Sequence, residues 1–361
     1  MKSNDTASPR AATYAAAEGK SRPDASGFLF SIIVPVYNRP DEVADLLESL
    51  TRQTDRGFEI ILVEDGSTVP CRKQADAYAD AYADALDVKY FYKDNEGRSP
   101  ARNYGIEHSS GDYLVFVDSD CILPEDYVSS LRKCLTEDYH DCFGGPDAAH
   151  ESFSDIQKAI NYSMTSFLTT GGIRGGKVQL EKFVPRTFNT GFSRRVYEKV
   201  GGFREMFSED IDMSTRIRLA GFSIALFRPV VVYHKRRIDL RKFWRQVHVF
   251  GMSRITLQLL YPGSMKIVHW LPALFVIFAL AMIVGAFFWK WMLIPLAVYI
   301  LAVWLCGIYA TRSLKIGSLG VITSLIQLCG YGTGFIRAYT WKILLRHGRD
   351  EKQEREMRRG K

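Results

Sequence analysis

Residues 111–124, GDYLVFVDSDCILP, decide the fold that the sequence predicts. Residues 113–117 are a short run of aromatic and β-branched side chains, the pattern of a fully buried strand. The run ends in Asp118-Ser119-Asp120, so this strand would place two carboxylates at the carboxyl edge of a sheet, where open α/β sheets bind ligands. Carboxylates this close repel each other unless a cation lies beside them, and their hard oxygens suit Mg²⁺ or Mn²⁺. A solvated Asp-rich turn is the other interpretation of the motif.

Strand and helix patterns alternate in the chain before this stretch. Apolar, β-branched runs predict strands, and periodic apolar residues predict helices; on the first helix these are Val43, Leu46, Leu47 and Leu50, at i, i+3, i+4 and i+7. The expected strands are 31–36, 59–63 and 88–92, and the expected helices are 41–54, 75–86 and 101–108. Alternation at this spacing predicts an α/β fold with a mainly parallel, doubly wound sheet.

Polar residues follow each of the expected strands. They are Asn38, Glu64-Asp65, Asn95, and the pair Asp118 and Asp120. Because the carboxyl ends of parallel strands share one edge of a sheet, these side chains should meet in one crevice.

A second acidic motif lies further along the chain. Residues 187–192 predict a strand or loop that leads into a helix at 194–200, and Gly201-Gly202 ends that helix. Ser208 is the expected N-cap of a helix over 211–220, with Glu209-Asp210 in its first turn. Helix capping and catalysis are both open interpretations of these two carboxylates.

Seven short motifs in this order resemble family 2 glycosyltransferases, which have the nucleotide-diphospho-sugar transferase (GT-A, Rossmann-like) fold. The resemblance covers residues 30 to about 251. One departure is Glu64, where the family more often has Asp. The motifs are Val34 to Asn38, Glu64 to Ser67, Asn95-Glu96-Gly97 with Ala101-Arg102-Asn103, Asp118 to Asp120, Asn189 to Phe192, Gly201 to Phe203, and Glu209 to Asp212 with Arg216 and Gly221.

The resemblance implies a pocket for a nucleotide-sugar donor. Asp65 would hold the uracil or ribose of what we expect to be a UDP-sugar. Pro35, Tyr37 and Asn38 would line the base pocket, and Arg102 would face the nucleotide or its diphosphate.

It also implies the chemistry of transfer. Asp118 would contact the ribose, and Asp120 would coordinate a divalent metal, Mg²⁺ or Mn²⁺, which neutralises charge on the leaving diphosphate. Asp210 would act as the general base for an acceptor hydroxyl, giving inversion at the anomeric carbon. The acceptor expected is a saccharide or a polyprenyl-linked saccharide.

The last third of the sequence is strongly apolar. Residues 267–289 and 291–311 carry no formal charge, are long enough to cross a bilayer and have only Lys290 between them, so they predict a tight transmembrane hairpin. Residues 316–336 contain five glycines and predict either a third span or a re-entrant segment. The positive-inside rule favours the re-entrant alternative, which keeps the basic C-terminal residues in the cytoplasm.

Basic residues interleave with Phe243, Trp244 and other apolar side chains in residues 235–262. This predicts an amphipathic helix in contact with membrane lipid, or a surface helix docked on the catalytic domain. The other expected units are a disordered tail (1–27), a GT-A catalytic domain (28–234), a membrane domain (263–345) and a basic tail (346–361).

Composition restricts the function further. The net charge of +7 and a basic tail with few aromatic residues do not favour a nucleic-acid partner. The six cysteines show no zinc-binding spacing. We therefore expect a multi-pass enzyme of the inner (cytoplasmic) membrane, its catalytic domain in the cytoplasm, that builds surface polysaccharide. A non-catalytic nucleotide-binding scaffold and a processive synthase are the alternatives.

Overall fold

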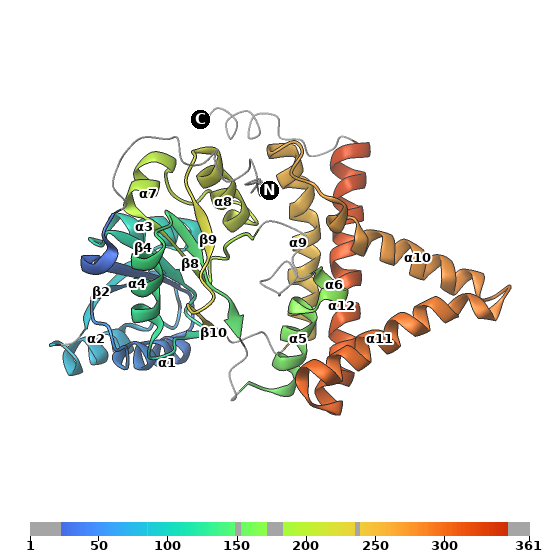
Figure 1. Cartoon of the computed structure of the whole chain (residues 1–361), viewed down its shortest axis with the longest axis horizontal. Helices are drawn as coiled ribbons and strands as arrows, with labels where there is room; N and C mark the ends of the chain where they lie inside the picture. The colour runs from blue at the N-terminus through green and yellow to red at the C-terminus, as the bar shows by residue number, and fades with distance from the viewer. Residues whose placement is uncertain (1–22, 85, 149–152, 172–182, 235–238, 346–361) are drawn as a thin grey trace, which may run out of the picture.

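The computed structural model describes residues 23–84, 86–148, 153–171, 183–234 and 239–345. An α/β part built on a large sheet occupies one side of the molecule, and long helices from the last third of the chain pack against it (Figure 1). The tail expected at 346–361 lies outside the described residues, as does most of the tail expected at 1–27.

Seven strands of the described residues form one sheet in the order β3-β2-β1-β4-β8-β6-β9. The first four are parallel, which confirms the predicted mainly parallel α/β fold. β8 is the exception: it runs antiparallel to both β4 and β6, and it places the Asn189 to Phe192 motif beside β4. The strands are β1 (Phe30–Val36), β2 (Phe58–Asp65), β3 (Asp87–Lys93), β4 (Tyr113–Val117), β6 (Cys142–Gly144), β8 (Asn189–Ser193) and β9 (Ile224–Leu226).

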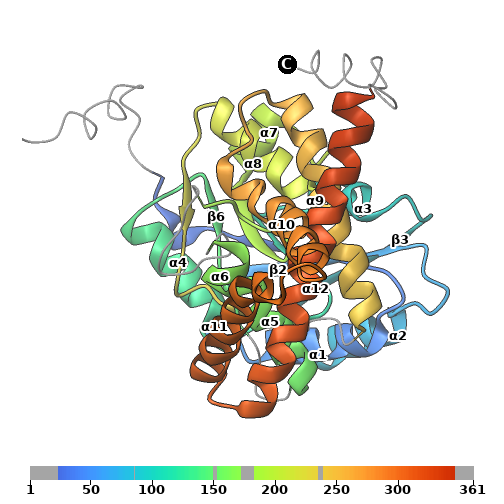
Figure 2. The same ribbon diagram turned by 90° about the vertical axis from the view of Figure 1, so that its right-hand side faces the viewer.

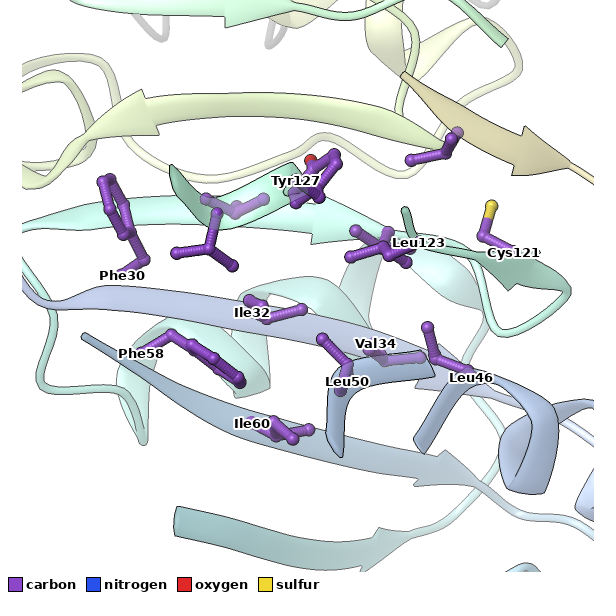
Figure 3. Packing of buried hydrophobic residues seen from close by; sticks show 14 of the residues in the cluster. Phe30, Ile32, Val34, Leu46, Leu50, Phe58, Ile60, Cys121, Leu123 and Tyr127 are labelled. Carbon is purple, nitrogen blue, oxygen red and sulfur yellow. The ribbon is translucent and has the colours of Figure 1, made fainter. Parts of the chain in front are cut away.

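Helices cover both faces of this sheet. Side chains of β1 alternate between the faces: Ile32 and Val34 lie in one core, and Ile33 lies in the other. Figure 3 shows the first core, where Leu46 and Leu50 pack onto the strands. The covering helices are α1 (Pro40–Thr51), α2 (Arg72–Ala81) and α4 (Tyr127–Glu137) on one face, and α3 (Arg98–Glu107), α7 (Arg194–Val200) and α8 (Glu209–Leu219) on the other. In the described residues a smaller sheet, β5 (Cys121–Ile122), β10 (Val232–His234) and β7 (Asp147–Ala148), lies beside them.

The ordered chain begins earlier than predicted. Residues 23–27, which we expected to be disordered, include a short 3₁₀ turn, Ala25–Gly27, with Ala25 fully buried. Arg132 of α4 donates hydrogen bonds to the carbonyl oxygens of Ala25 (3.2 Å) and Phe28 (2.8 Å). These long-range contacts have no local sequence signal, so the prediction for residues 23–27 was wrong.

Two long helices, α9 (Leu240–Leu260) and α12 (Leu314–Tyr339), lie side by side (Figures 1 and 2). They approach closely because glycines stand at their crossing. A Cβ added to Gly334 of α12 would lie 2.0 Å from the carbonyl oxygen of His248 on α9. One added to Gly332 would lie 2.4 Å from the carbonyl oxygen of Pro272 on α10 (Leu271–Gly285). The glycines that weakened the apolar pattern of residues 316–336 therefore serve helix packing.

The helix α12 is continuous from Leu314 to Tyr339, with a π turn to Leu344. It contains no reversal, so the re-entrant alternative for residues 316–336 was wrong. By length and composition, two helices of the described residues could cross a membrane: Lys290–Thr311 and Leu314–Leu344. Whether they do so stays a prediction.

The expected span over residues 267–289 is also corrected. Only Leu271–Gly285 is α-helical there, because a 3₁₀ turn precedes Pro272 and the helix ends at Gly285. Fifteen residues reach roughly 22 Å, short of a hydrocarbon layer of about 30 Å. The chain then reverses and continues as α11 (Ile294–Thr311), whose arm diverges from α10 (Figure 1).

Two helices from the middle of the chain, α5 (Asp155–Thr165) and α6 (Phe167–Thr170), connect the α/β part to the C-terminal helices. The Thr323 hydroxyl of α12 donates to the carbonyl oxygen of Ala159 on α5 (2.9 Å). The Tyr162 hydroxyl donates to the carbonyl oxygen of Val303 on α11 (2.9 Å). All four residues come from segments more than a hundred positions apart, so the two parts fold against each other.

Candidate active site

A pocket of about 460–530 Å³ is the usual size for a small-molecule site, and one of 530 Å³ lies at the carboxyl edge of the parallel strands. This is the edge where polar residues were predicted to converge. Six of the eight predicted site residues line it, whereas Asn38 and Asp210 do not. The six are Pro35, Tyr37, Asp65, Arg102, Asp118 and Asp120.

Arg102 is the central cation of this pocket. It is 1% exposed, and its Nη2 donates to Asp118 Oδ1 at 2.9 Å. Its Nη1 donates to Glu209 Oε1 at 3.0 Å, and Glu209 also accepts from Arg98 Nε at 3.1 Å. Glu209 begins α8, so Arg102 joins the pocket to the helix that carries Asp210.

Asp120 is paired with an arginine that the sequence reasoning missed. Arg39, which follows β1, places Nη1 2.5 Å from Asp120 Oδ2. Its position directly after the first strand is the only sequence signal, because residues there share the edge with Asp120. The side chains of Asp118 and Asp120 are 31% and 14% exposed, so both carboxylates face the pocket.

These two carboxylates suit a divalent cation that also binds substrate phosphates, since Mg²⁺ is commonly held by one or two protein carboxylates and phosphate oxygens. The described residues contain no cluster of three His, Cys, Asp or Glu side chains that could hold a metal by themselves. A metal here would therefore share its ligands with a substrate.

Asp65 is almost fully buried and holds the loop after β3. Its Oδ2 accepts from Gly97 N (2.8 Å), and its Oδ1 accepts from Glu96 N (3.0 Å) and Lys93 Nζ (3.1 Å). Gly97, with φ of +99°, turns this loop toward the pocket that both residues line. Asp65 thus shapes the pocket wall, whatever it contacts in a donor.

The residues expected at the base pocket behave differently from one another. Tyr37 is 52% exposed and lines the pocket. Asn38 adopts φ of +53° and turns its side chain to the loop after β2, where Oδ1 accepts from Val69 N (2.9 Å) and Thr68 Oγ1 (3.0 Å). Asn38 therefore supports the loop from outside the pocket.

Glu64, the departure from the family pattern, is structural here. It is fully buried, and its carboxylate accepts from the Ser67 hydroxyl, from Cys71 N (2.8 Å) and from the Tyr90 hydroxyl (3.3 Å). Burial and the neighbouring Glu64 carboxylate raise the pKa of Tyr90 above its usual range. Glu64 thus fixes the loop that Asn38 also contacts.

Asp210 lies in the first turn of α8, outside the pocket that holds Asp120. Its Oδ2 accepts from Arg186 Nη1 at 3.0 Å, and its side chain is 16% exposed. Its neighbour Glu209 points to Arg102. The N-terminus of α8 therefore stands next to the pocket, with Asp210 held toward Arg186.

Ser208 does not cap α8 with its side chain, contrary to prediction. Its backbone is left-handed (φ +64°), and its hydroxyl shares a hydrogen bond with the Ser253 hydroxyl on α9 (2.8 Å). A tertiary contact thus replaces the local cap.

Residues 31–201 match the sequence profile of the family described as Glycosyl transferase family 2. The α/β part belongs to glycosyltransferase family 2. This matched segment contains β1 to β4, β8 and all the pocket residues from Pro35 to Asp120.

Curated relatives agree with the family. Over 109 residues the glycosyltransferase is 38% identical to glycosyltransferase GlyA of Streptococcus pneumoniae, covering 30% of this chain and 15% of the relative. It is 37% identical over 107 residues to an uncharacterized glycosyltransferase of Rickettsia conorii, covering 30% and 17%. The chain spans about a sixth of the length of these two relatives.

A solved structure shares the fold of almost the whole glycosyltransferase. It is the mannosyltransferase PcManGT of Pyrobaculum calidifontis, in complex with GDP-Man and Mn²⁺. The two chains superpose with a TM-score of 0.55 at 16% identity, over 91% of this chain and 92% of that one.

Proposed function

We propose that this protein transfers a sugar from a nucleoside-diphospho-sugar, with UDP-sugars as the first candidates, to an acceptor hydroxyl with inversion at the anomeric carbon. The observation that carries the proposal is the pocket in which Asp65, Arg102, Asp118 and Asp120 meet at the carboxyl edge of the family 2 sheet. Its volume of about 530 Å³ suits a single nucleotide-sugar.

The donor's negative charge would be bound by this chain's arginines. Arg102 and Arg98 both line the pocket, and Arg39 lies across it beside Asp120. Guanidinium groups bind phosphate oxygens in a bidentate geometry, so these residues would orient the diphosphate. Asp118, held by Arg102, would then face the ribose.

A divalent cation fits beside Asp120 and Asp118, and when bound it would neutralise the charge that develops on the departing diphosphate. The complex of the structurally similar PcManGT with Mn²⁺ supports Mn²⁺ as the first ion to test. The described residues provide too few carboxylates to hold the ion alone, so we expect donor and ion to bind together.

Asp210 is the proposed general base. It would accept the proton of the acceptor hydroxyl as the oxygen attacks the anomeric carbon and the bond to the diphosphate oxygen breaks. Arg186, 3.0 Å from its carboxylate, would keep Asp210 ionised and oriented. Glu209, bound to Arg102, would keep the start of α8 at the donor pocket.

We place the C-terminal helices in a membrane. Large apolar side chains of α10 and α11 are exposed, among them Phe278, Leu280 and Leu301, and two helices have the length and composition of spans. The finer location follows as a proposal: the inner (cytoplasmic) membrane, with the catalytic domain in the cytoplasm where nucleotide-sugars are made, in synthesis of a surface polysaccharide.

The test is release of nucleoside diphosphate by the full chain in nanodiscs, with Mn²⁺ and a panel of UDP- and GDP-sugars. Asp120→Ala and Asp210→Asn should each lower turnover about 10²- to 10⁴-fold. Asp210→Asn should still bind the nucleotide, because the donor pocket is intact. The control is Asp41→Asn, an exposed carboxylate in the first turn of α1.

Two outcomes would overturn the proposal. One is turnover that survives in both variants. The other is nucleotide binding by the wild type without turnover of any sugar, which would instead indicate a scaffold that binds nucleotides.

A further inference from the structure

A second cavity, of about 460 Å³, lies between α8 and the C-terminal helices. Most of its lining is apolar, and it is built by residues from α6, α8, α9, α10, α11 and α12. These include Leu168, Ile211, Leu257, Phe275, Tyr299 and Leu328. The cavity is therefore formed only when the α/β part and the apolar helices pack together.

One end of this cavity is next to Asp210. Ser208 and Ile211, on either side of the Glu209-Asp210 pair, both line it, and so does Arg186, which donates to the Asp210 carboxylate. Glu209 faces the donor pocket through Arg102. The first turn of α8 thus stands between the donor pocket and the apolar cavity, with Asp210 at the junction.

The cavity also contains buried cationic and polar groups. Arg254 of α9 is only 8% exposed and donates from Nη2 to the carbonyl oxygen of Ser264 (2.6 Å). Gln327 of α12 is 8% exposed, and its Oε1 has no hydrogen-bond partner among the described residues. A buried polar atom without a partner is costly unless a ligand satisfies it. Arginines at a cavity with apolar walls suit an anionic head on an apolar chain.

We propose that this cavity binds the acceptor as a lipid phosphate with one long apolar chain, of the polyprenyl phosphate class. This inference rests on the proposed function and names its acceptor. The chain would lie against Leu257, Phe275 and Leu328, and the anionic head would lie toward Arg186 and Arg254. The nucleophilic oxygen, on the phosphate or on a sugar it carries, would then reach Asp210.

The volume and location of the cavity favour this occupant over others. About 460 Å³ is enough for one ligand chain near the head, and the remainder of a long chain would continue along the exposed apolar surfaces of α10 and α11. A diacyl phospholipid would need two chains seated together. A free saccharide would leave the apolar walls without a partner.

Lipid binding by the full chain in phosphatidylcholine nanodiscs tests the inference without relying on turnover. Native mass spectrometry or fluorescence titration would measure a long-chain polyprenyl phosphate, a short prenyl phosphate and a phosphatidic acid. We expect the wild type to bind the long polyprenyl phosphate at least tenfold more tightly than the other two.

Leu257→Trp places a larger side chain in the cavity, since Leu257 lines it and is 1% exposed. It should weaken long-chain binding at least tenfold while leaving UDP affinity unchanged. Thr170→Trp, on the short helix α6, is a milder variant with the same expectation in case Leu257→Trp does not fold. The matched control is Ile277→Trp, on the outward face of α10 and 52% exposed, which should bind as the wild type does.

The inference is overturned if Leu257→Trp and Thr170→Trp fold, bind UDP and still bind the polyprenyl phosphate normally. It is also overturned if phosphatidic acid binds as tightly as the polyprenyl phosphate. A wild type that binds the lipid in this cavity but never releases nucleoside diphosphate would contradict the proposed function and leave the lipid site standing.

Discussion

Arg102 and Glu209 form an ion pair that is buried on both sides, with Nη1 and Oε1 3.0 Å apart and side chains 1% and 3% exposed. The pair joins α3 to α8 across more than a hundred residues. Because Arg102 also holds Asp118, one guanidinium sets the position of the donor pocket and of the helix that carries Asp210.

Glu209→Ala should therefore disturb both stability and donor binding. Removing one partner of a buried pair leaves an uncompensated charge, at a cost of about 3–5 kcal/mol. We expect a lower unfolding midpoint and weaker UDP binding, because Arg102 would lose the contact that orients it toward Asp118. Asp76→Ala, which breaks the exposed Arg72–Asp76 pair, is the control and should change neither quantity measurably. Equal effects of the two variants would contradict this reading of the pair.

Arg39 should compete with metal for Asp120. Its Nη1 lies 2.5 Å from Asp120 Oδ2, so a cation that approaches this carboxylate must displace a bound guanidinium. Arg39→Gln should tighten binding of Mn²⁺ alone by roughly three- to tenfold, as measured by electron paramagnetic resonance of the free ion. Arg52→Gln, at an exposed pair on the same helix region, serves as the control. Unchanged or weaker Mn²⁺ affinity in Arg39→Gln would show that the ion binds elsewhere.

Glu59 should make the stability of the α/β part depend on pH in acid. Burial by itself raises the pKa of Glu59, but hydrogen bonds from Lys89, Ser110 and Ser31 outweigh it and lower the pKa from 4.5 to about 2. The stabilisation is therefore fully present above about pH 4.5 and is lost as the pH falls toward 2.

The measurement is urea unfolding of wild type and Glu59→Gln between pH 7 and pH 2. The wild type should be more stable at pH 7, by on the order of 3 kcal/mol, and the difference should shrink through the acid range. Glu107→Gln, at the exposed end of α3, is the matched control. A difference for Glu59→Gln that does not vary with pH would rule out this linkage.

Gly334→Ala should separate α9 from α12. The new Cβ would lie 2.0 Å from the His248 carbonyl oxygen, a backbone atom that cannot move without shifting the helix. Overpacking of this kind costs about 1–3 kcal/mol. We expect a lower thermal midpoint in detergent and weaker lipid binding at the neighbouring cavity. Gly27→Ala, which has open space around the added Cβ, should have no effect. Equal midpoints for both variants would show that the helices adjust freely.

The α/β part was predictable because its signals are local. The strand ends at Asp65, Asp118 and Asp120 follow from apolar runs that stop at polar residues, and parallel pairing then brings them to one edge. The antiparallel β8 was predicted only as a strand or loop, because the strand that pairs with it is far away in sequence.

Predictions failed where long-range packing decides the structure. Arg39 and Glu209 owe their places in the site to partners in distant segments, Asp120 and Arg102, which no local pattern specifies. Likewise the glycines of α12 weaken its apolar pattern when read as sequence alone, yet in the structure they let other helices approach.

The contact between α5 and α12 determines how this protein can be divided for experiments. Ile160 and Met164 of α5 share a small core with Phe243 and Val247 of α9, and α12 closes over both helices. A truncated version made to avoid detergent, cut before the C-terminal helices, would expose that core to water. Such a fragment should aggregate, and its inactivity would say nothing about catalysis by the intact enzyme.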